Sequence, residues 1–303
     1  MPELPDVVVY VEQLARRLVG QPLGGVRVRT PFVLRSFDPP LRAVSGKTVR
    51  GMRRLGKRIV FSLDDELFVV VHLMIAGRFH WKDKPSAPIA GKVGVAAFDF
   101  PAATLLLTEA SMKKRASIHV VRGEASLSTM HAGGLEVLEA DLPSFRAALV
   151  RENHTLKRAL TDPRLFSGIG NAYSDEILHR ARLSPVAQTH KLDDVTIARL
   201  FEATRATLVE WTERLRRELG DAFPEKVTAF RQEMAVHGKF KEPCPVCGSP
   251  VQRIVHAENE TNYCARCQTG GKLLADRALS RLLKGDWPRS LDELDEHIAT
   301  RKG

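Results

Sequence analysis

Four cysteines near the carboxyl end form the clearest chemical pattern in the sequence. Two residues separate Cys244 from Cys247 and Cys264 from Cys267, and 16 residues lie between the two pairs. This spacing is typical of a tetrahedral zinc site, and four unligated thiols are the alternative. Because four sulfurs leave no open coordination position, the pattern predicts one structural Zn²⁺ ion and requires any catalysis to come from other residues.

A second pattern, Gly168-Ile-Gly-Asn171, stands at the start of a predicted helix over 171–181. The free N–H groups and the positive dipole end of a helix start bind phosphate, and the glycines let a DNA backbone come close. The alternative is an ordinary turn between helices with Asn171 as the N-cap.

Apolar periodicity predicts the elements that position these residues. Val7, Val11, Leu14 and Leu18 recur on one face of a helix that follows Pro5 and ends at Gly20. Short apolar or alternating runs from 24 to 122 predict an antiparallel β-sandwich. Its expected strands are 26–28, 58–61, 67–71, 94–100 and 104–108.

After Gly133 the pattern becomes helical. The expected helices are 143–150, 155–160, 171–181, 193–219, 272–283 and 290–299, and the expected ribbon strands are 252–255 and 261–263. The expected domain boundaries are 1–135 for the β-sandwich domain, 136–240 for the helical domain, 241–268 for the zinc ribbon and 269–303 for a helical extension.

The composition favours a polyanionic partner. The formal net charge is +10, although an ordinary basic surface is the alternative. The first residues lack the cationic start and apolar run of a secretory signal, and the apolar stretch 67–77 is too short to cross a bilayer. We therefore expect a cytoplasmic, nucleoid-associated protein that has no membrane role and acts as a monomer.

Three further segments accompany the cysteines. They are Pro2-Glu-Leu-Pro5 with Asp6, Gly56-Lys-Arg-Ile59 with His72-Leu73 and Gly77, and Gly168-Ile-Gly-Asn-Ala-Tyr173 with Asp175-Glu-Ile-Leu178. With them, most of residues 1–268 resembles the formamidopyrimidine-DNA glycosylase and endonuclease VIII family. The resemblance implies a multidomain α+β fold: an N-terminal helix plus an antiparallel β-sandwich, a helical helix-two-turn-helix domain and a C-terminal four-cysteine zinc ribbon.

The resemblance implies a DNA-repair glycosylase that also nicks abasic sites. If Met1 is removed, Pro2 exposes a secondary amine with a pKa of about 8, and its neutral fraction can attack C1′ of a damaged nucleoside. The adjacent Glu3 is expected to act as general acid. By resemblance, Lys57 contacts phosphate or donates a proton. Taken alone, Lys57 would be an exposed lysine and Glu3 a carboxylate interacting with the first helical turn.

The resemblance also assigns contacts with damaged DNA. Asn171, Gly170 and Lys157 are expected to hold the phosphates that flank the lesion. Side chains from two loops are expected to fill the gap left by the flipped base. These residues are Met74, Ile75, Lys113, Lys114 and Arg115.

The sequence departs from the family at two of these places. Asn259 stands where the family usually carries an arginine, between Glu258 and Glu260, and no phenylalanine follows the basic residues 113–115. The departures leave open a substrate such as a bulky or single-stranded lesion. Two other hypotheses stay open: a catalytically silent DNA-binding protein, for which retention of Met1 would suffice, and a zinc-ribbon protein of RNA metabolism.

Overall fold

The computed structural model describes residues 1–89, 91–225, 227, 231–256, 259–275 and 288–300. The chain divides into two compact units. The first comprises Met1–Gly133 and Val209–Ala229, and the second comprises Gly134–Leu208 and Phe230–Gly303. Residues 209–219 of the long helix α6 (Asp194–Leu219) therefore belong to the first unit, although the sequence places them in the second expected domain.

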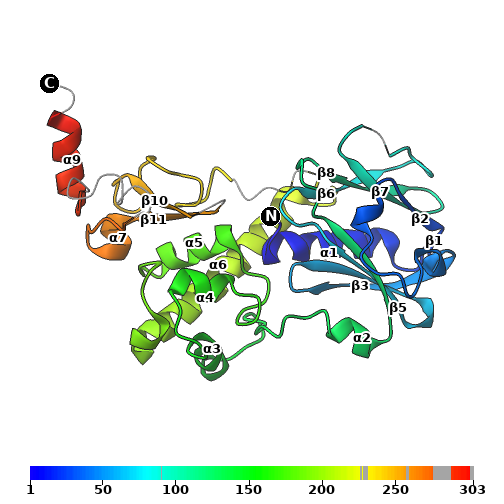
Figure 1. Ribbon diagram of the computed structural model, residues 1–303, viewed down its shortest axis with the longest axis horizontal. Coiled ribbons are helices and arrows are strands. Elements are labelled where there is room, and N and C mark those ends of the chain that lie inside the picture. Colours follow the sequence, from blue (N-terminus) through cyan, green and yellow to red (C-terminus); the bar gives the residue numbers. More distant parts are fainter. Residues whose placement is uncertain (90, 226, 228–230, 257–258, 276–287, 301–303) are drawn as a thin grey trace. The chain divides into compact units, whose positions relative to one another are not determined.

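The first unit is an antiparallel β-sandwich with helix α1 (Leu4–Leu18) packed against it (Figure 1). The strand order is β1-β3-β4-β5-β9 in one sheet and β2-β7-β8-β6 in the other. The strands are β1 (Pro22–Leu23), β2 (Gly25–Val28), β3 (Lys47–Leu55), β4 (Arg58–Leu63), β5 (Leu67–His72), β6 (Gly77–Lys82), β7 (Gly94–Asp99), β8 (Thr104–Glu109) and β9 (Ser117–Arg122).

Side chains that alternate along the strands form the core between the sheets. Phe61 of β4 stacks on Phe98 of β7 with ring centroids 5.4 Å apart, and Tyr10 of α1 meets Phe79 of β6 edge to face at 6.0 Å. The opposite face of the five-stranded sheet carries a smaller apolar cluster with Val60, which is covered by Leu127 of α2 (Glu124–Ser128).

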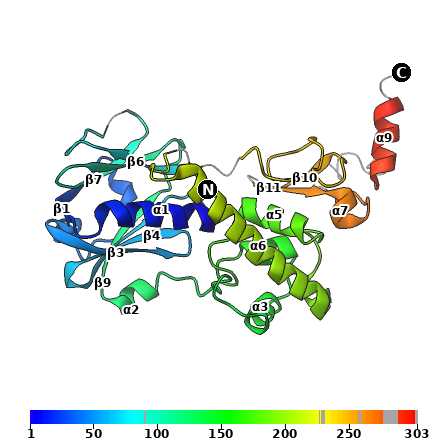
Figure 2. The same cartoon turned by 180° about the vertical axis from the view of Figure 1, so that it is seen from behind.

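The second unit is helical and contains the ribbon, which helix α9 (Leu291–Thr300) follows in the chain (Figure 2). Phe145 of α3 packs against Phe166 and Phe201, with ring centroids 4.8 and 5.2 Å apart. Its other helices and ribbon strands are α4 (Leu156–Thr161), α5 (Asn171–Arg180), β10 (Val251–His256), β11 (Asn259–Cys264), α7 (Ala265–Thr269) and α9 (Leu291–Thr300), and α3 spans Leu142–Leu149.

The predicted fold class is confirmed, with a multidomain α+β chain, an antiparallel sandwich, helices and a four-cysteine ribbon. Helix α1 begins at Leu4, before the predicted start, and β1, β3, β6 and β9 were not predicted. The predicted helix over 272–283 falls largely on residues 276–287, which lie outside the described residues. Among the helices of the described residues, none combines the length and apolarity needed to cross a membrane.

Candidate active site and DNA-contacting residues

The amino end of the chain is buried at the start of α1. Pro2 is buried, and Glu3 is 2% exposed. The backbone N–H of Glu3 donates to Oδ2 of Asp6 (3.0 Å), and the carbonyl of Glu3 accepts from the N–H of Val7 (2.9 Å). These two bonds fix the backbone of the residue that follows Pro2.

Charged groups surround the terminal amine. Burial lowers the pKa of the Met1 amine below 8.0, Arg78 and Lys57 lower it further, and Glu3 and Asp6 act in the opposite direction. Because only the neutral form of an amine is nucleophilic, these surroundings favour attack on an electrophile at neutral pH.

Lys57 lies in the two-residue loop of the β3–β4 hairpin, in which Leu55 pairs with Arg58. Gly56, the first loop residue, has a φ of 62° and therefore needs glycine. The sequence pattern predicts Lys57 at the strand start, whereas it lies one residue before β4. Burial lowers the pKa of Lys57, and nearby Glu3 raises it. Pro2, Glu3 and Lys57 therefore lie in one region of the first unit.

One arginine and two histidines lie next to this region, on the outer face of the five-stranded sheet. Arg58 of β4 pairs with His72 of β5, and His119 lies on the adjacent strand β9. Burial first, then Arg58, Lys57 and His119, lower the pKa of His72 to about 4. The sequence did not identify Arg58, Arg78 or His119, although two-residue alternation along β4, β5 and β9 would place Arg58, His72 and His119 on one face.

The first predicted wedge loop follows β5 directly. Met74 adopts a positive φ of 53°, and Ile75 is 54% exposed. The N–H of Gly77 donates to the carbonyl of Leu73 (2.8 Å), and a Cβ at Gly77 would lie 2.2 Å from that oxygen. Glycine is therefore required to close the loop. Nη1 of Arg78 donates to the carbonyl of Ile75 (3.2 Å).

The second predicted wedge loop joins β8 to β9. Buried Glu109 accepts from the backbone N–H groups of Arg115 (2.9 and 3.0 Å) and Ala116 (3.1 Å), and Lys114 donates to its carbonyl. Lys113 and Arg115 are exposed. Met112 is 99% exposed at the tip, so an apolar side chain is available there even though no phenylalanine follows.

Two of the predicted phosphate-contacting residues, Lys157 and Asn171, belong to a network around buried Asp175. Nζ of Lys157 donates to Oδ1 of Asp175 (2.5 Å) and to the carbonyl of Asn171 (2.7 Å). Oδ2 of Asp175 faces Nδ1 of His237 (2.8 Å), and Asn262 donates to the same oxygen (3.5 Å). Fully buried Asp175 therefore links helix α5 to the segment before the ribbon and to the ribbon itself.

Asn171 is the first residue of α5, and Gly170 occupies the N-cap position, so the interpretation of Asn171 as N-cap is wrong. Nδ2 of Asn171 donates to the carbonyl of Glu260 (3.0 Å). The Glu260 carboxylate accepts from Asn262 (3.2 Å) and Arg253 (3.3 Å). Asn259 is exposed at the start of β11.

The four cysteine Sγ atoms lie within 4.8 Å of one another. A set of four thiols fits Zn²⁺, which prefers soft ligands in a tetrahedral arrangement. The backbone N–H of Cys267 lies 3.5 Å from Sγ of Cys264, as expected for a thiolate ligand. The predicted structural zinc site is confirmed, since Cys244, Cys247, Cys264 and Cys267 lie together in a segment that matches a zinc-finger family.

Comparisons with known families cover most of the chain. Residues 1–112 match the formamidopyrimidine-DNA glycosylase N-terminal domain, and residues 135–217 match the formamidopyrimidine-DNA glycosylase H2TH domain. Residues 241–270 match a zinc finger found in FPG and IleRS.

Curated relatives extend the similarity to nearly the whole chain. Formamidopyrimidine-DNA glycosylase of Heliobacterium modesticaldum is 30% identical over 282 residues, covering 88% of this chain and all of the relative. The Thermus thermophilus protein of that name is 32% identical, covering 89% of this chain and all of the relative. An uncharacterized formamidopyrimidine-DNA glycosylase-like protein of Mycobacterium tuberculosis is 39% identical over half of this chain and 94% of its own length.

Solved structures show the same fold. The LlFpg protein in complex with a THF-DNA and an inhibitor has a TM-score of 0.77 and 25% identity, and it covers 88% of this chain and all of that chain. Lactococcus lactis Fpg in complex with an abasic site containing DNA has a TM-score of 0.76 and 26% identity, with 88% and 99% coverage.

Proposed function

The chain belongs to the formamidopyrimidine-DNA glycosylase family, and we propose that it excises damaged bases from DNA through a Schiff base at Pro2 and then nicks the strand by elimination. The supporting observation is the buried amino end: Pro2 and Glu3 are buried, and the terminal amine of Met1, next to Pro2, has a pKa lowered by burial in the neighbourhood of Glu3 and Lys57.

The reaction begins with the exposure of Pro2 by removal of Met1. The secondary amine of Pro2 attacks C1′, and the bond from C1′ to the base breaks. Glu3 donates a proton to the departing sugar or base oxygen. The Pro2 nitrogen then loses its proton, and the C1′–O4′ bond of the sugar ring breaks as O4′ takes up a proton, which leaves an iminium between Pro2 and C1′. The iminium acidifies the C2′ proton, and loss of that proton expels the 3′ phosphate and cuts the strand.

The remaining residues bind and orient the DNA. Lys57 contacts a phosphate or donates a proton. Lys157, Asn171 and Gly170 hold phosphates, since Gly170 leaves the α5 start open to a backbone. The two wedge loops fill the space left by a flipped base through Met74, Ile75, Lys113, Lys114 and Arg115. One chain carries every one of these groups, so we propose that it acts as a monomer on damaged DNA.

Borohydride reduction tests the covalent step. Protein whose Met1 has been removed, verified by mass spectrometry, is incubated with abasic-site DNA and borohydride. We expect a stable adduct at the Pro2 nitrogen in the amino-terminal peptide, less adduct from Pro2→Gly, and no adduct at Pro2 from protein that retains Met1, because its proline nitrogen is acylated. No adduct from wild-type protein with a free proline would exclude the lyase mechanism.

A second candidate is a family member directed to bulky or single-stranded lesions. Two features of the ribbon favour this candidate. Asn259 stands where the family usually has an arginine, and the carbonyl of Glu260 accepts a hydrogen bond from Asn171. A panel of defined lesions in duplex and single-stranded DNA separates the two candidates by their excision rates.

A further inference from the structure

A loop of the first unit, outside the segments that carry the proposed catalytic residues, exposes two aromatic rings. The Phe32–Phe37 loop, defined as residues 29–42, follows β2 and includes the 3-10 helix Pro31–Val33. Phe32 is 77% exposed and Phe37 is 86% exposed. An exposed phenylalanine ring forgoes the favourable free energy of burial, so two exposed rings on one short loop indicate a binding surface.

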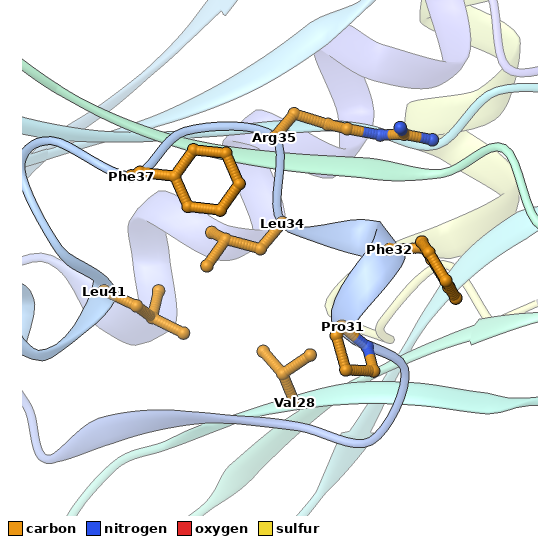
Figure 3. Close-up of a pocket in the computed structure, with 7 residues that line it drawn as sticks. All are labelled: Val28, Pro31, Phe32, Leu34, Arg35, Phe37 and Leu41. Atoms are coloured by element: carbon orange, nitrogen blue, oxygen red, sulfur yellow. The ribbon is translucent and has the colours of Figure 1, made fainter.

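The two rings flank a cavity of about 650 Å³. Figure 3 shows the side chains of Leu34 and Val28 between the rings of Phe37 and Phe32, with Leu41 below Phe37 and Arg35 extending above Leu34. The cavity therefore offers an apolar floor, two aromatic faces and one guanidinium group.

The loop is held in place by the sandwich. The N–H of Arg35 donates to the carbonyl of Ile118 (2.9 Å) on β9, and Oγ of Ser36 accepts from the N–H of Val120 (2.7 Å). Val33 is buried in the main core. The two rings are thus presented on an ordered backbone, which reduces the entropy lost when a ligand binds.

Positive charge accompanies the aromatic rings. Arg29, Arg35 and Arg42 are exposed, and Asp38 is the one acidic residue among positions 29–42, so the loop carries a net charge of +2 (three arginines minus one aspartate). Arg35 also lies near His119 of β9, whose pKa is lowered by burial first and then by Arg58 and Arg35, so a second arginine is close to the loop.

Arg58 lies between this loop and the proposed catalytic residues in the set of neighbouring side chains. Arg58 lowers the pKa of both His119 and His72, and it directly follows Lys57 in the chain. All of these groups belong to the first unit. A polyanionic strand that reaches Lys57 can therefore follow favourable charge to the Phe32–Phe37 loop.

We propose that the Phe32–Phe37 loop binds an unpaired segment of a DNA strand, with bases stacked on Phe32 and Phe37 and phosphates held by Arg29, Arg35 and Arg42. Exposed aromatic rings interleaved with arginines are the combination that binds single strands, because every base has a face that stacks. The inference rests on the proposed function only in taking DNA as the partner. It names the form of that DNA: a duplex with an unpaired stretch beside the lesion.

The test compares two DNA probes that carry the same abasic-site analogue. One is a blunt duplex, and the other has a flanking oligothymidine single strand that contains 5-bromodeoxyuridine. We expect the wild type to prefer the second probe, and ultraviolet cross-links to map to the peptide that contains Phe32 and Phe37. The double variant Phe32→Ala/Phe37→Ala should lose about 5- to 150-fold in affinity per stacked base for that probe, with unchanged affinity for the blunt duplex.

Two further variants separate stacking from apolar docking. Phe32→Leu/Phe37→Leu keeps apolar side chains but removes the rings, and it should bind the single-stranded probe as weakly as the alanine variant. Phe37→Trp should bind at least as well as wild type. Val19→Ala, which truncates another exposed apolar residue of the first unit, is the matched control and should change nothing. Thermal unfolding verifies that each variant folds.

Equal affinity of wild type and both double variants for the single-stranded probe would overturn the inference. So would binding of an acidic, leucine-rich peptide that the leucine variant retains and the alanine variant loses, since the loop would then serve a protein partner. Adduct yield on the blunt duplex is scored separately. If the adduct forms but the loop variants bind the single-stranded probe as well as wild type, only this inference is refuted. If binding depends on the loop but no adduct forms, only the lyase mechanism is refuted.

Discussion

Nε2 of His179 lies 3.3 Å from Sγ of Cys244, so buried helix α5 contacts a zinc ligand directly. An imidazole N–H that donates to a thiolate stabilises its negative charge and fixes its direction. The ribbon is therefore joined to the helical unit at the metal site itself as well as through the antiparallel pair β10–β11 and its contact with α5.

His179→Ala should weaken zinc binding by about 10- to 100-fold, because the Cys244 thiolate loses its hydrogen-bond partner. Competition with a chromophoric chelator measures the affinity. His190→Ala is the control, since the exposed Nε2 of His190 contacts the carbonyl of Val150 (2.8 Å), away from the cysteines. Equal zinc affinity of His179→Ala and wild type would show that the contact does not support the metal.

Asp175→Asn should destabilise the second unit by about 3–5 kcal/mol, because it leaves the charge of Lys157 buried without its carboxylate. Denaturant unfolding measures the free energy. Glu242→Gln, which removes the partly exposed Lys239–Glu242 pair (3.0 Å), should cost under about 1 kcal/mol. Similar losses for both variants would contradict the importance of the buried network.

Glu3→Gln should slow base excision by about 10²- to 10⁴-fold, because the amide cannot serve as general acid. The borohydride adduct with a preformed abasic site should persist, since no base has to leave. Glu12→Gln lies on the same helix in an exposed pair with Arg216 and should leave both readouts unchanged. Equal excision rates for Glu3→Gln and wild type would remove Glu3 from the mechanism.

Adduct formation should depend on pH with a midpoint below about 8, because burial and nearby cations lower the pKa of the Met1 amine, and the Pro2 amine becomes the terminal amine of this buried end once Met1 is removed. The rate should fall as the pH falls through this midpoint, since the protonated amine is not a nucleophile. Lys57→Gln removes one of the cations and should move the midpoint upward. An unchanged midpoint would show that Lys57 does not lower the pKa of the amine. Adduct yields from single-turnover reactions measure both profiles.

The stability of the first unit should decrease as the pH falls from about 6.5 to about 4. Folded His72 stays neutral, with a pKa lowered to about 4, whereas the unfolded chain takes up the proton near 6.5. The unfolded state thus binds more protons in this window, and each proton contributes up to about 1.4 kcal/mol per pH unit. His72→Gln should flatten the dependence in urea unfolding, and an unchanged slope would contradict the assignment.

Much of the fold could be predicted because its elements carry strong periodic patterns. Helices α1 and α6 carry apolar residues at helical spacing, and the strands β4, β5, β7 and β8 are short, largely buried apolar runs. Strand β3 (Lys47–Leu55) was missed because it carries four basic residues and buries only Val49 fully, so its alternation is weak. Its place between β1 and β4 depends on tertiary pairing.

The sites differ in how far the sequence determines them. The cysteine spacing alone predicts the metal site, because two short pairs bind one ion. Pro2, Glu3 and Lys57 could be singled out only through resemblance to a family. The proximity of Arg78 to the terminal amine depends on how β6 packs, and the Asp175 network joins segments that lie far apart in the sequence. Local pattern carries no information on such contacts.

The burial of Pro2 and the bonded amide of Glu3 have a practical consequence for handling the protein. An affinity tag fused ahead of residue 1 would keep Met1 in the chain, so the proline nitrogen would stay acylated. The tag would also extend from a residue next to the buried start of α1. Preparations tagged in this way should bind DNA and yet score as inactive. A purification handle therefore belongs at the carboxyl end, and a negative activity assay is informative only when the residue that begins the purified polypeptide is known.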